Sequence, residues 1–347
     1  MNNTIISENS ANYKRYQLKV GWLGVLVIAL IAALLLALTS GAISINITDL
    51  VLNASENNEL EQQIFTEIRL PRVILAAFCG AALALVGAVL QGLFRNPLAD
   101  PGLIGVSSGA ATGAIAWLTL GHFLSLSAEL NVYLLPLSAC AGGVFVTLLL
   151  YFMGKYWGRY SLATMLLIGI ALNAISVSII GVFQFIADDT QLRSLTFWLM
   201  GSFGRAQWPT LTPVIITVTG CAIFLLFSSK KLDRLQLGES TALTLGVDVR
   251  RIKIQLVIVS AIAVGSVVAI SGIINFIGLV VPHIVRLIGG ANHRFVLPAA
   301  MILGSILTVL SDLVARMLLP PAELPVGLIT SLIGAPFFLW LIARSKT

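Results

Sequence analysis

Long apolar runs alternate with short polar connections along nearly the whole chain. The clearest run extends from Val73 to Phe94, and about 20 apolar residues suffice for a helix to cross a bilayer. Because only helices satisfy their own backbone groups in lipid without forming a closed barrel, each such run predicts a membrane-spanning helix. About ten spans are expected: 20–38, 73–94, 103–120, 131–153, 162–186, 209–229, 254–270, 275–290, 296–315 and 326–343. The pattern therefore predicts an all-α polytopic membrane protein with one transmembrane domain over residues 1–347.

The connection between the second and third expected spans is broken by prolines, at Pro97 and Pro101. In the run that follows, Gly105, Gly109 and Gly113 stand four residues apart. This spacing places the three glycines on one helix face, where the backbone of another helix can approach closely. We interpret them as a helix-packing stripe.

Lysine and arginine collect in alternate connections, which sets the orientation of a membrane protein. The richer set includes residues 14–19, 155–159, 230–234 and 250–253, and we place it in the cytoplasm. Both termini then lie inside, with residues 1–19 as a cytoplasmic tail, and the acidic segment 44–67 lies outside. The first run is too long for the apolar part of a typical signal peptide, so we expect it to be retained as a span.

Composition narrows the classes of function. The 347 residues are 58% hydrophobic and only 10% charged, whereas an ordinary soluble domain is about a quarter charged. The net charge of +6 comes from the basic connections, so it does not indicate nucleic-acid binding. Cys79, Cys140 and Cys221 are scattered through apolar runs, which favours neither a disulfide framework nor a metal site.

Ten spans divide into two groups of five. The proline-broken connection at 95–102 would then have a counterpart near Ser271, Gly272 and Pro282. Because five is odd, a duplicated half would be inverted in the membrane, which is a common plan among transporters.

One cytoplasmic loop, residues 230–253, is long and charged. We expect Ser240 to cap a short helix that runs through Leu245 and ends at Gly246, and Asp248 to cap the next helix. Two interpretations are open: a surface connector, or a coupling element that docks on a partner. The candidate coupling residues are Leu237, Gly238, Glu239, Ser240, Leu243, Leu245 and Gly246.

Little in the sequence points to catalysis. Residues 105–109 fit the G-x-S-x-G nucleophile pattern, but a serine hydrolase needs a histidine partner, and small residues in a packing stripe are the simpler interpretation. The histidines, His122, His283 and His293, lie far apart, and we expect His293 in a solvated loop. We therefore expect no catalytic residue, no metal site and no cofactor.

The energy source is expected in another chain. The sequence has no G-x-x-x-x-G-K-[ST] phosphate loop. It also lacks carboxylates at mid-span, which argues against a secondary transporter. An intramembrane hydrolase and a secondary transporter are the less favoured alternatives.

Several segments together resemble the FecCD-type permeases, which are membrane subunits of ATP-driven importers for iron–siderophores, haem and cobalamin. They are IRLPR (68–72), GAVLQGLFRNPLADPGLIGVSSGA (87–110), LGESTALTLGV (237–247), INFIGLVVPHIVRLIGG with NHR (274–294) and ELPVGLITSLIGAPFFLWL (323–341). The resemblance implies a ten-helix subunit of the bacterial inner membrane. It also implies a homodimer with the path on its two-fold axis, two ATP-binding subunits inside and a periplasmic binding protein outside.

The resemblance also suggests a ligand. Residues 187–198 with Gly201 and Ser202 look most like the haem members, so we expect haem import, with a ferric siderophore or cobalamin as the alternative. A large planar or greasy ligand would suit this aromatic outer segment in any of these cases.

Arg69, Arg72 and Arg316 stand at the outer surface, against the inside preference of basic residues. They could pair locally, Arg316 with Asp312 or Arg69 with Glu67, or their stems could extend along the bilayer edge. Arginine also presents a planar fork to a carboxylate. In the family that the chain resembles, arginines at these places take glutamates of the binding protein, so we predict a docking role for them.

Overall fold

The computed structural model describes residues 2–41, 58–124, 128–156, 162–319 and 322–344, and these residues form helices and connections without a β-strand. Seven helices in this part of the chain are long and apolar enough to cross a membrane. The seven candidate spans lie in α1 (Asn2–Thr39), α4 (Leu70–Phe94), α6 (Ala128–Tyr156), α7 (Leu162–Ile186), α9 (Trp208–Phe227), α12 (Val249–Ser271) and α14 (His293–Met317). The expected all-α membrane fold is confirmed.

Three further apolar helices, α5 (Val106–Leu120), α13 (Ile277–Gly289) and α15 (Val326–Arg344), match the remaining expected spans. Short elements connect the spans: α3 (Asn58–Gln63), η1 (Ile64–Arg69), η2 (Pro101–Ile104), η3 (Gly121–Leu124), α8 (Asp189–Met200), α10 (Ser229–Gln236) and α11 (Glu239–Thr244). The short spans α5 and α13 both follow irregular backbone. These two breaks meet, because a methyl group at Gly278 would contact Pro101 and Asp100.

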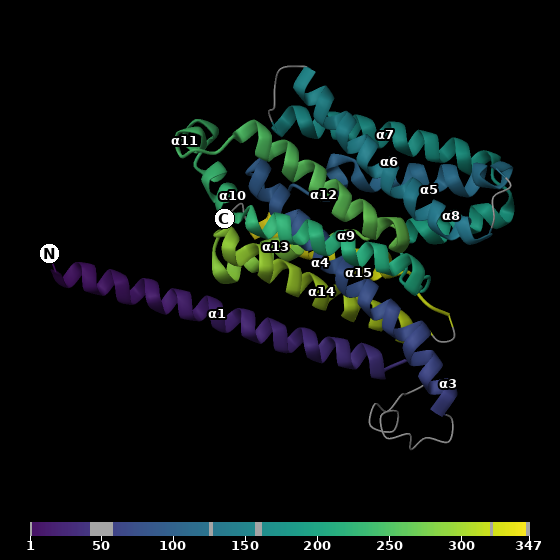
Figure 1. The fold of residues 1–347 in the computed structure, drawn as a ribbon, viewed down its shortest axis with the longest axis horizontal. Coiled ribbons are helices and arrows are strands. Elements are labelled where there is room, and N and C mark those ends of the chain that lie inside the picture. Colours follow the sequence, from purple (N-terminus) through teal and green to yellow (C-terminus); the bar gives the residue numbers. More distant parts are fainter. Residues whose placement is uncertain (1, 42–57, 125–127, 157–161, 320–321, 345–347) are drawn as a thin grey trace.

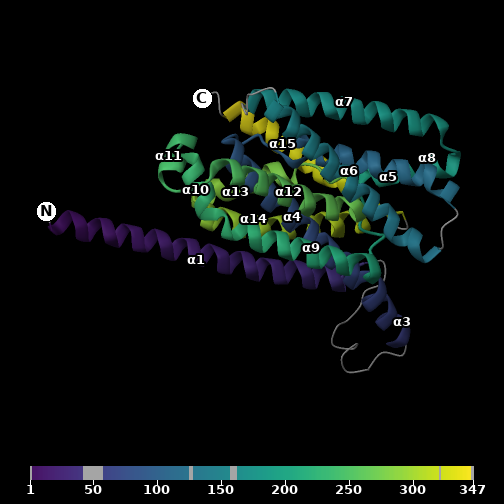
Figure 2. The ribbon, with the colours of Figure 1, turned by 45° about the horizontal axis from the view of Figure 1, so that its top comes forward.

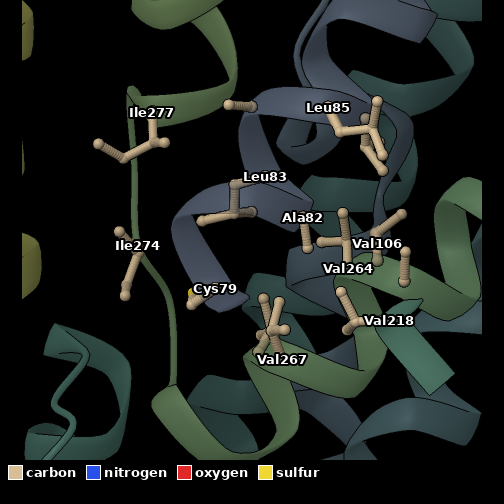
Figure 3. Packing of buried hydrophobic residues seen from close by; sticks show 14 of the residues in the cluster. Cys79, Ala82, Leu83, Leu85, Val106, Val218, Val264, Val267, Ile274 and Ile277 are labelled. Carbon is tan, nitrogen blue, oxygen red and sulfur yellow. The ribbon is translucent and has the colours of Figure 1, made fainter. Parts of the chain in front are cut away.

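Helix α4 is the centre of the bundle, with α12 and α14 packed against it (Figure 1). Figure 3 shows side chains of α4, including Cys79, Ala82 and Leu83, packed among Val264 and Val267 of α12. In lipid, helices associate by close packing rather than by expelling water. The α4 and α14 backbones meet where a methyl group at Gly80 or Gly304 would overlap the other glycine's carbonyl.

The start of α1, the end of α15 and the pair α10–α11 lie at one end of the bundle, whereas α3 and α8 lie at the other (Figures 1 and 2). An even number of spans requires the two chain ends to share a side. Following the orientation predicted from the lysine and arginine distribution, we refer to the end with α10 and α11 as the cytoplasmic end and to the other as the outer end.

The entry into α4 differs from the simple helix start that Pro71 suggests. Helix α3, the π-helical turn η1 and α4 follow one another directly, so Pro71 stands in a continuous helical segment from Asn58 to Phe94. Proline has no N–H to donate to the preceding turn, and the π-helical register stands immediately before it. Insertions of this kind are common at functional sites.

Candidate functional site

The cytoplasmic loop forms two short helices, α10 and α11, between the spans α9 and α12. Gly238 and Gly246 stand on either side of α11, with φ angles of +107° and +78°. Residues that carry a side chain rarely adopt such angles. Asp248 caps α12 by accepting a hydrogen bond from the Arg251 N–H at 3.0 Å, as expected. The expected Ser240 cap is wrong, because the helix begins at Glu239 directly after Gly238 and Ser240 already lies in its first turn.

Three large apolar side chains of this loop face away from the protein, among exposed polar ones. Ala242 is fully buried against the bundle, but Leu237, Leu243 and Leu245 are exposed. Monomeric proteins rarely gather large apolar side chains on a water-facing surface unless a partner covers them. The three leucines lie between the end of α9 at Phe227 and the start of α12 at Val249, outside both apolar spans.

Polar contacts hold α11 in place. Lys253 of α12 pairs with Glu239 at 2.6 Å, and the Arg234 guanidinium of α10 donates to the Leu245 carbonyl at 3.1 Å. The exposed leucines are thus presented on a short helix that is fixed at both sides.

The outer end contains a buried ion-pair network. The Arg72 guanidinium donates through Nε and Nη2 to both oxygens of Asp312 at 2.9–3.0 Å, and through Nη1 to Glu323 at 2.8 and 3.0 Å. Arg316 pairs with Asp312 at 3.2 Å, so that local pairing is confirmed. Asp312 is only 1% exposed, whereas Glu323 is about half-exposed.

Arg69 and Arg316 both bind the end of α1. Arg69 Nη1 donates to the carbonyls of Leu38 and Thr39 at 2.9 and 3.1 Å, and Arg316 Nη2 donates to the Ala37 carbonyl at 3.0 Å. The last carbonyls of a helix lack backbone partners and carry its negative partial charge. Two arginines from different helices therefore close the C-terminal end of α1.

These bonds change how the three arginines could act in docking. Arg69 and Arg72 are buried, and Arg316 is nearly so, so they do not form an open basic patch. A carboxylate from a partner would reach Arg72 only by replacing Glu323, the exposed member of the network. The role of Glu323 was missed in the sequence because it lies 251 positions from Arg72.

The predicted glycine stripe lies against α6. A methyl group at Gly109 or Gly113 would overlap the carbonyl oxygens of Gly142 and Ser138, and one at Gly105 would press on Val146. Ser108, beside this stripe, donates to Asn173 Oδ1 of α7 at 2.5 Å. A bond to an amide oxygen joins helices and does not activate a nucleophile.

The aromatic outer segment forms helix α8. Asp188 and Gln191 form a reciprocal capping box at its start. Trp198 is buried while Phe197 is exposed, so only one of the two aromatic rings is presented at the surface. A methyl group at Gly327 would overlap the Met200 carbonyl, which places the end of α8 directly against the start of α15.

The prediction that His293 lies in a solvated loop is wrong. His293 is completely buried at the start of α14, where Asp233 of α10 binds it. Asparagine and arginine neighbours made the segment look like a surface loop, and no local signal indicates a partner 60 positions away.

Comparisons with known proteins agree with the expected resemblance. The FecCD transport family model matches residues 29–344. The hemin transport system permease protein HmuU of Yersinia pestis is 45% identical over 324 residues, covering 93% of this chain and 96% of that protein. The vitamin B12 import system permease protein BtuC of Vibrio parahaemolyticus is 41% identical over 287 residues, covering 82% and 84%.

A solved structure gives the same result for the fold. A metal-chelate-type ABC transporter in an inward-facing conformation superimposes with a TM-score of 0.82 at 35% identity, covering 93% of this chain and 98% of that one. The chain therefore belongs to the FecCD transport family and is the membrane-spanning permease subunit of an ATP-binding-cassette importer.

Proposed function

We propose that this permease imports haem. The observation that carries the proposal is the 45% identity to a hemin permease across nearly the whole chain, beside 41% to a vitamin B12 permease over a shorter span. The aromatic outer segment that forms α8 supports the same choice, because it resembles the haem members in sequence. A ferric siderophore or cobalamin is the alternative ligand.

The proposed assembly has partners at both ends. As an ABC importer permease, the chain works with ATP-binding and substrate-binding partners. We place two ATP-binding subunits at the α10–α11 end and a periplasmic binding protein at the α8 end of a permease homodimer in the bacterial inner membrane. The exposed leucines of the cytoplasmic loop support the first placement, and the ion-pair network around Glu323 supports the second.

Haem should drive the reconstituted complex. In proteoliposomes that contain the permease and its ATP-binding subunit, the haem-loaded binding protein should stimulate ATP hydrolysis and haem should accumulate inside. The control is the same binding protein without ligand. Stimulation by cobalamin or a ferric siderophore, with none by haem, would show that the ligand is wrongly assigned while the importer assignment stands.

Removing the Glu323 charge should accelerate docking of the binding protein. In Glu323→Gln, the Nη1 side of Arg72 loses its half-exposed counter-ion, so a partner carboxylate meets less competition and a more positive surface. Charges at the edge of an interface act mainly on association rates. The association rate constant should rise several-fold at low salt and return toward the wild-type value at high salt, where such charges are screened.

The matched control for this experiment is Glu67→Gln. Glu67 lies at the same end, is exposed and undergoes the same change of charge, but it is not bonded to Arg72. If both variants change the rate equally, only the overall charge matters and Arg72 is not a docking residue.

A further inference from the structure

One carboxylate oxygen joins the cytoplasmic loop to the start of a membrane span. Asp233 Oδ1 accepts the backbone N–H of His293 at 3.0 Å and lies 2.7 Å from Nδ1 of the same residue. His293 is the first residue of α14, where the N–H groups lack helical partners and favour a negative charge. Asp233 thus caps α14 from another helix while also holding the ring of its first residue.

The imidazole ring is held from its other side by α4. His293 is 0% exposed, and its Nε2 has no hydrogen-bond partner. A methyl group at Gly92, near the end of α4, would overlap Nε2, so the ring occupies space that only glycine leaves open. Partial burial alone would raise the pKa of Asp233, but the hydrogen bonds from His293 and the electrostatic effect of His293 and Arg294 together lower this pKa below its ordinary value.

Helix α10 connects the clamp that Asp233 and His293 form to residues 237–247, the candidate coupling segment. Leu232 and Leu235, on either side of Asp233, are buried, and helix α10 contacts both α4 and α14. The next residue after Asp233, Arg234, reaches the other way and binds the Leu245 carbonyl at the end of α11. Asp233 therefore binds the membrane span α14, and the adjacent Arg234 binds the candidate coupling segment.

The two spans that receive this connection, α4 and α14, contact each other at both ends and in the middle. Besides the clamp around His293, α4 and α14 meet backbone to backbone at Gly80 and Gly304. At the outer end, Arg72 of α4 binds Asp312 of α14. Helices that are fixed to each other at both ends and in the middle move as one body, because packed interiors are not continuously deformable.

We propose that Asp233 and His293 are positioning residues that transmit movement of α11 to the α4–α14 pair, and through it to the outer end. This inference rests on the proposed docking of an ATP-binding subunit at the coupling segment. A cap that only stabilised α14 would affect protein stability and leave the amount of substrate moved per ATP unchanged. The transport-to-hydrolysis ratio therefore separates the two roles.

The experiment uses the complete complex in proteoliposomes, with haem transport and ATP hydrolysis measured on the same preparation. In Asp233→Asn, the amide oxygen still accepts both bonds, so the ratio should stay within about twofold of wild type, whereas Asp233→Ala, which loses both, should lower it about fivefold or more. Arg234→Met cuts the connection on the α11 side and should lower the ratio as well. The ATP-binding subunit should co-purify with every variant.

Lys230→Met is the matched control, since Lys230 lies exposed on the same helix and loses the same charge as Arg234→Met. Its ratio should equal the wild-type ratio. If Asp233→Ala does not accumulate in membranes, the exposed Arg234 still decides, because its replacement does not disturb a buried site.

Two results would overturn the inference. One is a wild-type ratio in both Asp233→Ala and Arg234→Met; the other is an equal loss in Asp233→Asn and Asp233→Ala, since the asparagine keeps the geometry. A wild-type permease that neither binds the ATP-binding subunit nor transports haem would instead contradict the proposed function.

Discussion

Replacing Asp312 with alanine should destabilise the folded permease by about 3–5 kcal/mol, the usual cost of removing one partner from a buried ion pair. Asp312 is the only carboxylate among the described residues that pairs with both Arg72 and Arg316. Without it, Arg316 keeps only the Ala37 carbonyl and Arg72 keeps only Glu323. Two guanidinium groups would then lie close together with one half-exposed counter-ion.

Thermal unfolding of the purified protein in detergent measures the effect, with Glu323→Gln as the control at the same network. Because Glu323 is half-exposed and the glutamine still accepts a hydrogen bond, this variant should lose much less stability. Adding Arg72→Met to Asp312→Ala should restore part of the loss, since it removes one of the two unpaired charges. An Asp312→Ala protein as stable as wild type would mean that water hydrates the two guanidinium groups in place of Asp312.

The positions of the spans follow from the sequence because lipid imposes one strong requirement. A long apolar run has to satisfy its backbone internally, so runs such as 73–94 and 162–186 become α4 and α7 with ends displaced by few residues. The connection broken by Pro97 and Pro101 was predictable for a different reason, since proline interrupts helical hydrogen bonding. The inverted relation of the two halves stays a prediction.

Pairings between distant residues were not predictable in this way. Arg316 and Asp312 are four positions apart on one helix, so their pairing could be predicted from helical spacing. The bonds from Arg72 to Asp312 and Glu323 span 240 and 251 positions, and nothing local in the chain indicates which helices will meet. The central contact between Gly80 and Gly304 was missed because these glycines do not form a spaced series like 105, 109 and 113.

The local chemistry of the loop at residues 230–253 shows where neighbouring signals compete. Ser240 is a good capping residue by type, but Gly238 adopts the conformation that starts the helix two positions earlier. The apolar character of Leu243 and Leu245 was visible in the sequence, and their exposure was not. Exposure depends on how α10 and α11 fold back on the bundle, which the contacts of Arg234, Lys253 and Asp233 determine.

Leu243→Asp should abolish co-purification of the ATP-binding subunit while leaving the permease folded and inserted. Leu243 is 59% exposed, so the isolated chain should tolerate the change within about 0.5 kcal/mol. In the complex, the side chain would be covered, and burying a leucine contributes about 1.5–3 kcal/mol. An aspartate there would both lose this contribution and be desolvated without a partner, which costs several kcal/mol more. Leu245→Asp should act in the same direction.

Leu318→Asp is a close control for this experiment. Leu318 is 58% exposed and follows α14 at the outer end, so the residue, the exposure and the new charge are matched while the position is at the opposite side of the bundle. Purification through a tag on the permease, with the ATP-binding subunit quantified in the eluate, should give wild-type recovery for Leu318→Asp and little or none for Leu243→Asp. If the ATP-binding subunit is recovered equally with both variants, the exposed leucines of α11 belong to a surface connector. A charge in a desolvated contact would have weakened binding.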